Sequence, residues 1–194
     1  KNTKLIFLCS PNNPSGNALD TDEMMRIVKE SGAIVVIDEA YVDFSSLGSL
    51  KDKVLEYGNL VVLQTLSKAW GMAGLRLGIA YAQEYIIRLM SMVKYPYNIS
   101  QATQDAVSKL LENPIDEQVK EIIAERERLT EVIKGLSFIK KVYHSDANFL
   151  LVKTEDADSL YEHLLKDGII VRNRNKVEGC QACVRITIGL KEEN

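Results

Sequence analysis

The sequence predicts an α/β protein, in which part of a mainly parallel-sheet large domain is followed by a smaller α+β domain. Short, wholly apolar runs such as "AIVVID" and "NLVVLQT" are typical of strands that are buried on both faces of a sheet. Segments with helical periodicity separate or follow these runs. After residue 114 the pattern changes to short β segments around a helix, which favours a second, α+β unit.

In the first part, apolar runs predict strands over 4–10, 33–38, 59–65 and 77–82. A helix is expected over 19–32, because Asp20 can cap it with Glu23 three positions later and Gly32 can end it. Two further helices are expected, over 83–93 and 100–113.

In the second part, a long helix is expected over 114–135, between Pro114 and Gly135. Short strands over 139–143, 148–153, 169–172 and 184–189 should surround a helix over 156–168. We therefore expect 1–113 to belong to the large domain, and 114–194 to form the small C-terminal domain with its connecting long helix.

Composition excludes several classes of function. The net charge is −3 without a long basic run, so a nucleic-acid partner is not expected. The longest apolar runs are too short to cross a membrane. Three cysteines, an odd number, favour a reducing, cytoplasmic location. Cys180 and Cys183 form a C-x-x-C without a second cysteine pair, so neither a zinc site nor a redox site is expected there.

The start at Lys1, close to a strand, suggests that the chain is part of a longer polypeptide. We then expect these residues alone to expose a sheet edge and apolar surface, which another chain segment or a partner would cover.

Polar residues follow three of the predicted strands. Asn13 follows the first, Asp38 ends the second, and Thr65, Ser67 and Lys68 follow the third. Ligands of open parallel sheets bind beyond the carboxyl ends of the strands, so these side chains are expected to converge on one crevice.

The segment "TLSKAWGMAGLRLG" surrounds Lys68 with small residues and places Arg76 eight positions later. Hydroxyls of Thr65 and Ser67, backbone amides and Arg76 suit a phosphate monoester. The segment lacks the glycine spacing of a dinucleotide site and of a P-loop. A phosphate site, a nucleophilic lysine and a carboxylate are together the parts that pyridoxal phosphate requires.

Three segments, "TLSKAWGMAG", "NNPSG" and "DEAY", resemble in sequence and order the cofactor motifs of the fold-type-I, class II aminotransferases. This resemblance implies pyridoxal phosphate as cofactor, with Lys68 as the lysine that binds it covalently and moves the substrate proton. The implied cofactor contacts are the phosphate, held by Thr65, Ser67 and Arg76; the ring nitrogen, paired with Asp38; the phenolic oxygen, bound by Asn13 and Tyr41; and a ring face against Ala40.

The segment "CVRITIG" resembles the part of this family whose arginine binds the substrate carboxylate, which implies that role for Arg185. With Arg172, 13 positions earlier, the pair is most similar to the branch that acts on histidinol phosphate, a phosphorylated amino alcohol, with glutamate and 2-oxoglutarate as co-substrates. Arg174 is the alternative second anion ligand. An aromatic amino-acid aminotransferase is the nearest competing enzyme.

The resemblance also implies a homodimer when the chain is full length. Two alternatives to an active enzyme remain: a catalytically silent fragment, in which the 194-residue piece alone is inactive, and an aminotransferase-like binding module.

Overall fold

The structure is a computed structural model that describes residues 2–194, and its chain divides into two units. The first unit comprises Lys1–Ser10, Leu19–Asp43 and Leu47–Glu117. The second comprises Pro11–Ala18, Phe44–Ser46 and Gln118–Asn194. Two short segments from the first part of the sequence therefore pack with the C-terminal part. Among the described residues, no helix combines the length and apolarity needed to cross a bilayer.

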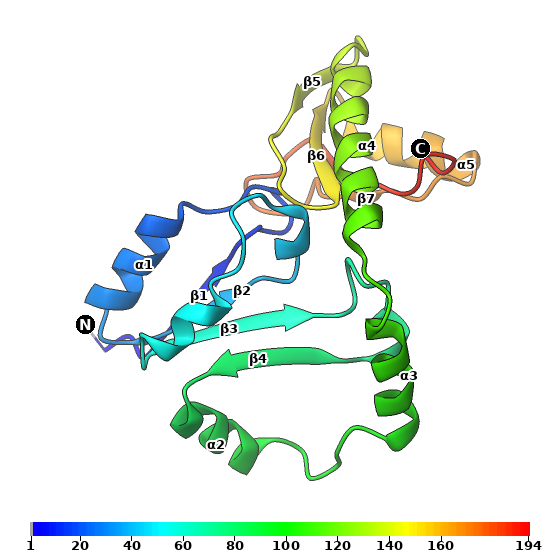
Figure 1. Ribbon diagram of the computed structural model, residues 1–194. Coiled ribbons are helices and arrows are strands. Elements are labelled where there is room, and N and C mark those ends of the chain that lie inside the picture. The colour runs from blue at the N-terminus through cyan, green and yellow to red at the C-terminus, as the bar shows by residue number, and fades with distance from the viewer. Residues whose placement is uncertain (1) are drawn as a thin grey trace. The chain divides into compact units, whose positions relative to one another are not determined.

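A four-stranded sheet forms the centre of the first unit, in the order β1-β2-β3-β4 (Figure 1). The first three strands pair in parallel and β4 pairs antiparallel with β3, which confirms a mainly parallel sheet. The strands and helices of this unit are β1 (Leu5–Cys9), α1 (Thr21–Glu30), β2 (Ile34–Asp38), the 3-10 helix η2 (Lys51–Leu55), β3 (Leu60–Thr65), the 3-10 helix η3 (Ala73–Leu75), β4 (Gly78–Ala82), α2 (Glu84–Val93) and α3 (Gln101–Leu111).

Alternation along the strands sends side chains to the two faces of this sheet. Val35 and Val62 pack with Val28 of α1 on one face, and Val36 and Val61 pack with Ile86 of α2 on the other. The predicted limits of α1 are confirmed by its caps. The Asp20 carboxylate accepts a hydrogen bond of 2.9 Å from the Glu23 N–H, and Gly32 after the helix has a φ of 63°.

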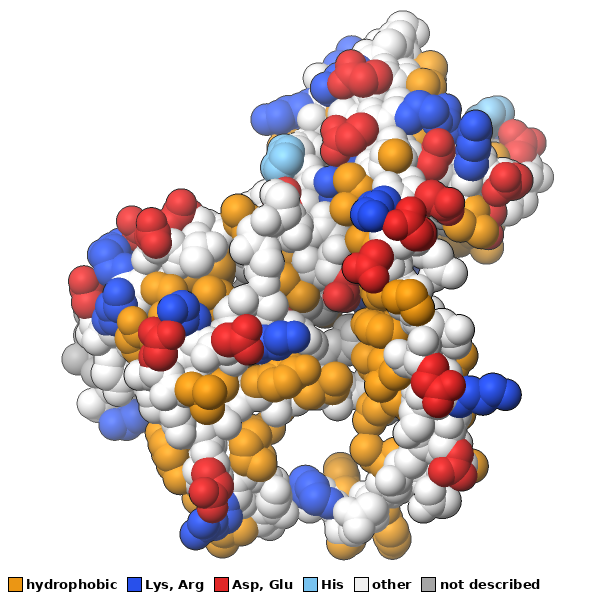
Figure 2. All heavy atoms as spheres, in the orientation of Figure 1, with side chains coloured by type: hydrophobic (Ala, Val, Ile, Leu, Met, Phe, Trp, Pro, Cys, Tyr) orange, Lys and Arg blue, Asp and Glu red, His pale blue; other side chains and the backbone are white. Residues whose placement is uncertain are grey.

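One face of the sheet is incompletely covered, as the sequence led us to expect. On the edge strand β1, Leu5 is 53% exposed and Phe7 is 64% exposed. They line an apolar groove of about 440 Å³ that α2 borders. Figure 2 shows further hydrophobic side chains gathered around β4, α2 and α3. Apolar surface and an unpaired strand edge are thus both present in this chain.

The second unit contains a sheet in the order β5-β6-β8-β7 whose strand pairs are all antiparallel. Leu129 and Ile133 of α4 pack on one face against Leu150, Val152 and Val184. Its elements are α4 (Asp116–Lys134), β5 (Ile139–Val142), β6 (Phe149–Thr154), α5 (Ala157–Lys166), β7 (Arg172–Asn173) and β8 (Cys183–Thr187). The chain passes from the first unit to the second within the 3-10 helix η1 (Val42–Phe44), because Asp43 belongs to the first unit and Phe44 to the second.

The strand expected over 169–172 is wrong in its extent, because β7 covers only Arg172–Asn173. The Ile169 N–H donates to the Leu164 carbonyl at 2.8 Å and so completes the end of α5. Gly168, with a φ of 78°, makes this turn possible. Ile169 and Ile170 remain exposed, although their apolar character suggested a strand.

Candidate functional site

Asp38 and Thr65 are the last residues of two neighbouring parallel strands, β2 and β3, and Ser67 and Lys68 follow β3. Asp38 pairs with Leu63, two residues before Thr65. The Asp38 carboxylate accepts a 3.0 Å hydrogen bond from the Ala40 N–H, which leaves further lone pairs for a ligand. The structure therefore places these groups at the carboxyl ends of parallel strands, where the sequence predicted them.

Lys68 lies in a tight loop between β3 and η3. The Gly71 N–H donates to the Lys68 carbonyl at 3.0 Å, and the Met72 N–H donates to the Leu66 carbonyl at 2.9 Å. The exposed Lys68 side chain places Nζ 5.3 Å from the centre of the Tyr41 ring. A cation at this distance from an aromatic face is attracted to it, so the lysine motif and the "DEAY" motif meet here.

Three groups suited to a phosphate lie at one end of the β3–β4 pair, where Thr65 is opposite Gly78. The Thr65 hydroxyl donates to the Ser67 hydroxyl at 3.0 Å, and the Ser67 N–H donates to Thr65 Oγ1 at 3.1 Å. Arg76 is exposed, has a φ of 55°, and donates from Nη1 to the Ala73 carbonyl at 3.0 Å. The hydroxyls and the guanidinium can donate hydrogen bonds to an anion, although Nη1 of Arg76 already donates to the Ala73 carbonyl.

Glu39 was not among the predicted site residues, yet it anchors the loop that carries Asp38 and Tyr41. Its side chain is buried, at 3% exposure for the residue. The carboxylate accepts hydrogen bonds from the Leu50 N–H at 2.7 Å, from Gln64 Nε2 at 2.8 Å, and from the Ser49 hydroxyl. The position of Glu39 within "DEAY" could have marked it as part of the site. Its hydrogen-bond partners could not be identified from the sequence.

The Asn13 loop belongs to the second unit. The Asp146 carboxylate accepts from the Ala18 N–H at 2.7 Å, and the Asp146 N–H donates to the Gly16 carbonyl at 2.8 Å. Gly16 has a φ of 87°, and a Cβ there would lie 2.7 Å from Ser145 Oγ. Only glycine fits this close approach without strain, which explains the glycine of "NNPSG".

Arg185 contacts this loop and an aromatic ring. Its Nη1 donates to Asn13 Oδ1 at 2.8 Å, and its guanidinium lies 4.8 Å from the centre of the Phe149 ring. Arg172 on β7 is the cross-strand partner of Arg185 on β8. Directly paired residues point to the same face of a sheet, so the two predicted anion ligands share one face.

Cys180 and Cys183 are buried with Leu151 in a small apolar cluster. Burial raises the pKa of the Cys183 thiol, and Cys180 raises it further. Within residues 2–194, no group of three or more potential ligands is placed to hold a metal ion. These thiols therefore pack as small apolar side chains in this structure.

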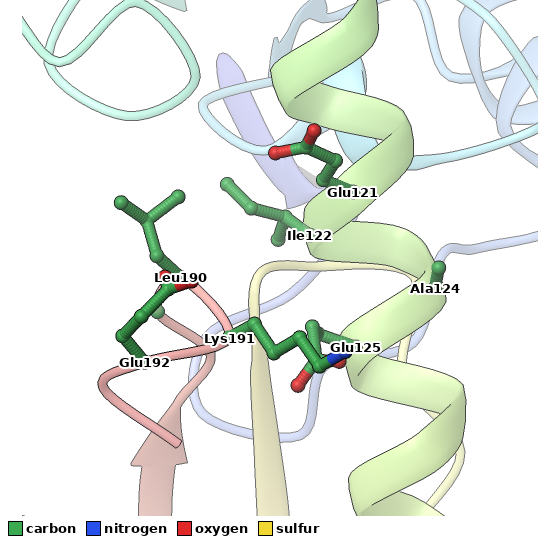
Figure 3. A pocket seen from close by; sticks show the side chains of 8 residues that line it. Glu121, Ile122, Ala124, Glu125, Leu190, Lys191 and Glu192 are labelled. Carbon is green, nitrogen blue, oxygen red and sulfur yellow. The ribbon is translucent and has the colours of Figure 1, made fainter.

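Another cavity lies between α4 and the C-terminal segment and has a volume of about 300 Å³. Figure 3 shows Glu121 and Glu125 on the helix, with Leu190, Lys191 and Glu192 on the segment. None of the predicted site residues lines it.

Comparison with known proteins places this geometry in context. The family model described as aminotransferase class I and II matches residues 1–194. A histidinol-phosphate aminotransferase from Parabacteroides distasonis is 53% identical over 99% of this chain and 56% of its own length. The chain thus spans little more than half of that relative.

Solved structures give the same comparison at the level of the fold. A histidinol-phosphate aminotransferase from Clostridium acetobutylicum has a TM-score of 0.87 and 27% identity, over 98% of this chain and 60% of its own. The Sinorhizobium meliloti histidinol-phosphate aminotransferase, solved in complex with pyridoxal-5'-phosphate, has a TM-score of 0.85 and 22% identity, over 97% and 54%. The predicted fold class is confirmed.

Proposed function

Since this chain belongs to the aminotransferase class I and II family, we propose that the full-length protein is a pyridoxal-phosphate-dependent aminotransferase that acts on histidinol phosphate with 2-oxoglutarate. The observation that carries the proposal is the meeting of Lys68 with Tyr41, beside the strand end that bears Asp38. The 53% identity to a histidinol-phosphate aminotransferase supports the substrate.

The donor set at this sheet edge fits the cofactor. The exposed Lys68 amine suits the aldehyde of the cofactor, and the Asp38 carboxylate, with unused lone pairs, suits its ring nitrogen. The paired hydroxyls of Thr65 and Ser67, with the Arg76 guanidinium, suit its phosphate. In this proposal Lys68 binds the cofactor covalently, Asp38 pairs with the ring nitrogen, and Thr65, Ser67 and Arg76 hold the phosphate. Bound pyridoxal phosphate supplies an electron sink for the electron pair that deprotonation leaves on the substrate carbon.

The remaining assignments concern the ring and the proton. Tyr41 and Asn13 would donate hydrogen bonds to the phenolic oxygen of the cofactor, and Ala40 would lie against one face of its ring. Once the substrate amine had displaced it, the Lys68 amine would accept the proton from the substrate Cα and deliver it to the C4′ carbon of the cofactor. A carboxylate paired with the ring nitrogen, as proposed for Asp38, would favour the protonated ring and so would make proton loss at the substrate Cα easier.

Arg185 and Arg172 supply the substrate contacts in this proposal. Because they share a face of the second sheet, their guanidinium groups can receive either the phosphate of histidinol phosphate or the carboxylate of glutamate. We further assign 1–113 to the large cofactor-binding domain and 114–194 to the small domain. The full-length protein is proposed to be a cytoplasmic homodimer.

The substrate proposal is tested with the full-length holoenzyme. We expect kcat/KM for histidinol phosphate to exceed that for phenylalanine clearly, with 2-oxoglutarate as acceptor in both assays. A preference for phenylalanine would replace the substrate by an aromatic amino acid and leave the cofactor chemistry in place. Cofactor bound without turnover of either amine would favour a binding module.

A further inference from the structure

A basic pocket lies at the free edge of the second sheet, where β7 is the edge strand. Its volume is about 450 Å³, and Arg172, Arg174 and Lys176 all line it. The one carboxylate in its wall is Asp158, whose oxygens accept hydrogen bonds from the side-chain amides of Asn173 at 2.6 Å and Asn175 at 2.8 Å. Among the described residues, no ion pair neutralises these three cations.

Arg174 continues the strand pairing beyond β7. Its N–H donates to the Cys183 carbonyl at 2.9 Å, one step along from the Asn173–Val184 pair. Because alternate residues of a strand share a face, Arg174 points to the same face as Arg172 and Arg185. Asn173 points to the opposite face, where it reaches Asp158 of α5.

One hydrogen-bond donor of the Arg174 side chain also lacks an acceptor within the described part of the chain. Its Nε is buried, and it has no hydrogen-bond partner among residues 2–194. A buried donor without an acceptor is unfavourable, and a guanidinium is a strong, forked donor for an oxyanion. Because Arg174 also lines the pocket, its guanidinium presents a charged donor to an anionic ligand there.

We infer that Arg174 is a specificity-determining residue that binds, together with Arg172, the phosphate of a phosphate-monoester substrate. This inference rests on the proposed function for the substrate, and it adds a residue that the Arg172–Arg185 pair does not include. A phosphate dianion has more charge and more acceptor oxygens than a carboxylate, so a third guanidinium on this face favours it over glutamate. Lys176 adds positive charge to the same pocket.

The test compares wild-type holoenzyme, Arg174→Gln, Arg174→Lys and the control Arg128→Gln, all in the full-length protein. Arg128 is a surface arginine of α4 that pairs with Glu125 at 2.8 Å and does not line this pocket. Each protein is assayed with histidinol phosphate and with histidinol, which lacks the phosphate. Circular dichroism checks that the variants are folded.

Arg174→Gln should lower kcat/KM for histidinol phosphate by about tenfold or more, with little change for histidinol, because a charge-assisted hydrogen bond to the phosphate is lost. Arg174→Lys should lose less, and Arg128→Gln should behave as wild type. An unchanged rate, or an equal loss with both substrates, would overturn the inference. If Arg174→Gln does not fold, Arg174→Lys decides by the same comparison.

A second readout separates this inference from the proposed function. If wild-type enzyme does not turn over histidinol phosphate, the proposed function fails. Inorganic phosphate is then titrated into the holoenzyme by calorimetry. Binding that weakens about tenfold or more in Arg174→Gln but not in Arg128→Gln would still establish the anion site. Binding that is absent or independent of Arg174 would overturn it.

Discussion

Replacement of Glu39 by alanine is expected to destabilise the first unit strongly. The Glu39 carboxylate accepts three hydrogen bonds, of which the one from the Leu50 N–H is buried and those from Ser49 and Gln64 are partly buried. Hydrogen bonds to a charged group contribute about 1.5–3 kcal/mol each. Counting the buried bond in full and the other two at half value gives a loss of about 4 kcal/mol in the free energy of unfolding.

Urea unfolding of the full-length protein, followed by far-ultraviolet circular dichroism, measures this loss. With a slope of about 2 kcal/mol per molar urea, the midpoint of the first-unit transition should fall by about 2 M. Glu39→Gln keeps the shape and part of the hydrogen bonding, so its loss should be smaller. Glu56→Ala is the control, because Glu56 forms an exposed pair with Lys53 and should change the midpoint little. If Glu39→Ala shifts the midpoint no more than Glu56→Ala, the anchoring role of this carboxylate is refuted.

Three other substitutions test different parts of the account. Asp38→Asn should retain bound cofactor, seen in its absorbance, while turnover falls by about 100-fold or more because the charge beside the ring is lost; normal turnover would mean that another acid serves the ring. Gly16→Ala should lower the free energy of unfolding by more than about 1 kcal/mol, since an alanine at a φ of 87° is strained and would meet Ser145; an unchanged melting temperature would contradict this. Hydrogen bonds from Ser159 lower the pKa of Asp156, the N-cap of α5, in the folded protein. The ionised Asp156 therefore stabilises the fold above its unfolded-state pKa, and this stabilisation is lost as the pH falls through the lower folded-state pKa. Asp156→Ala should therefore melt below wild type at neutral pH, and the difference should disappear in acid; a difference that grows in acid would have the wrong sign.

Local patterns in the sequence predicted most of the elements. The apolar runs predicted β1, β2, β3 and β4, and the two central strands, β2 and β3, pack apolar side chains on both faces of the sheet. Asp20 and Gly32 marked the ends of α1, since caps depend on nearby residues alone. The length of β7 was overestimated, because the Ile169 N–H donates to the Leu164 carbonyl in the turn that ends α5. The two isoleucines, Ile169 and Ile170, show no pattern in the sequence that would predict this hydrogen bond.

Long-range contacts account for what could not be predicted. The partners of Glu39 lie 10 to 25 positions further along the chain. The packing of the Asn13 loop with the second unit depends on Asp146, which bonds Ala18 from 128 positions away. The shared face of Arg172, Arg174 and Arg185 follows from the register of β7 and β8, which the spacing of the arginines alone does not specify.

Reduction of the cofactor-loaded full-length protein with borohydride shows whether Lys68 binds pyridoxal phosphate covalently. Peptide mass spectrometry after reduction identifies the modified lysine, and Lys68→Ala is the matched control. We predict one stable adduct, located on Lys68 and absent from the variant. An adduct on a different lysine, or no adduct on the folded full-length protein, would contradict the account.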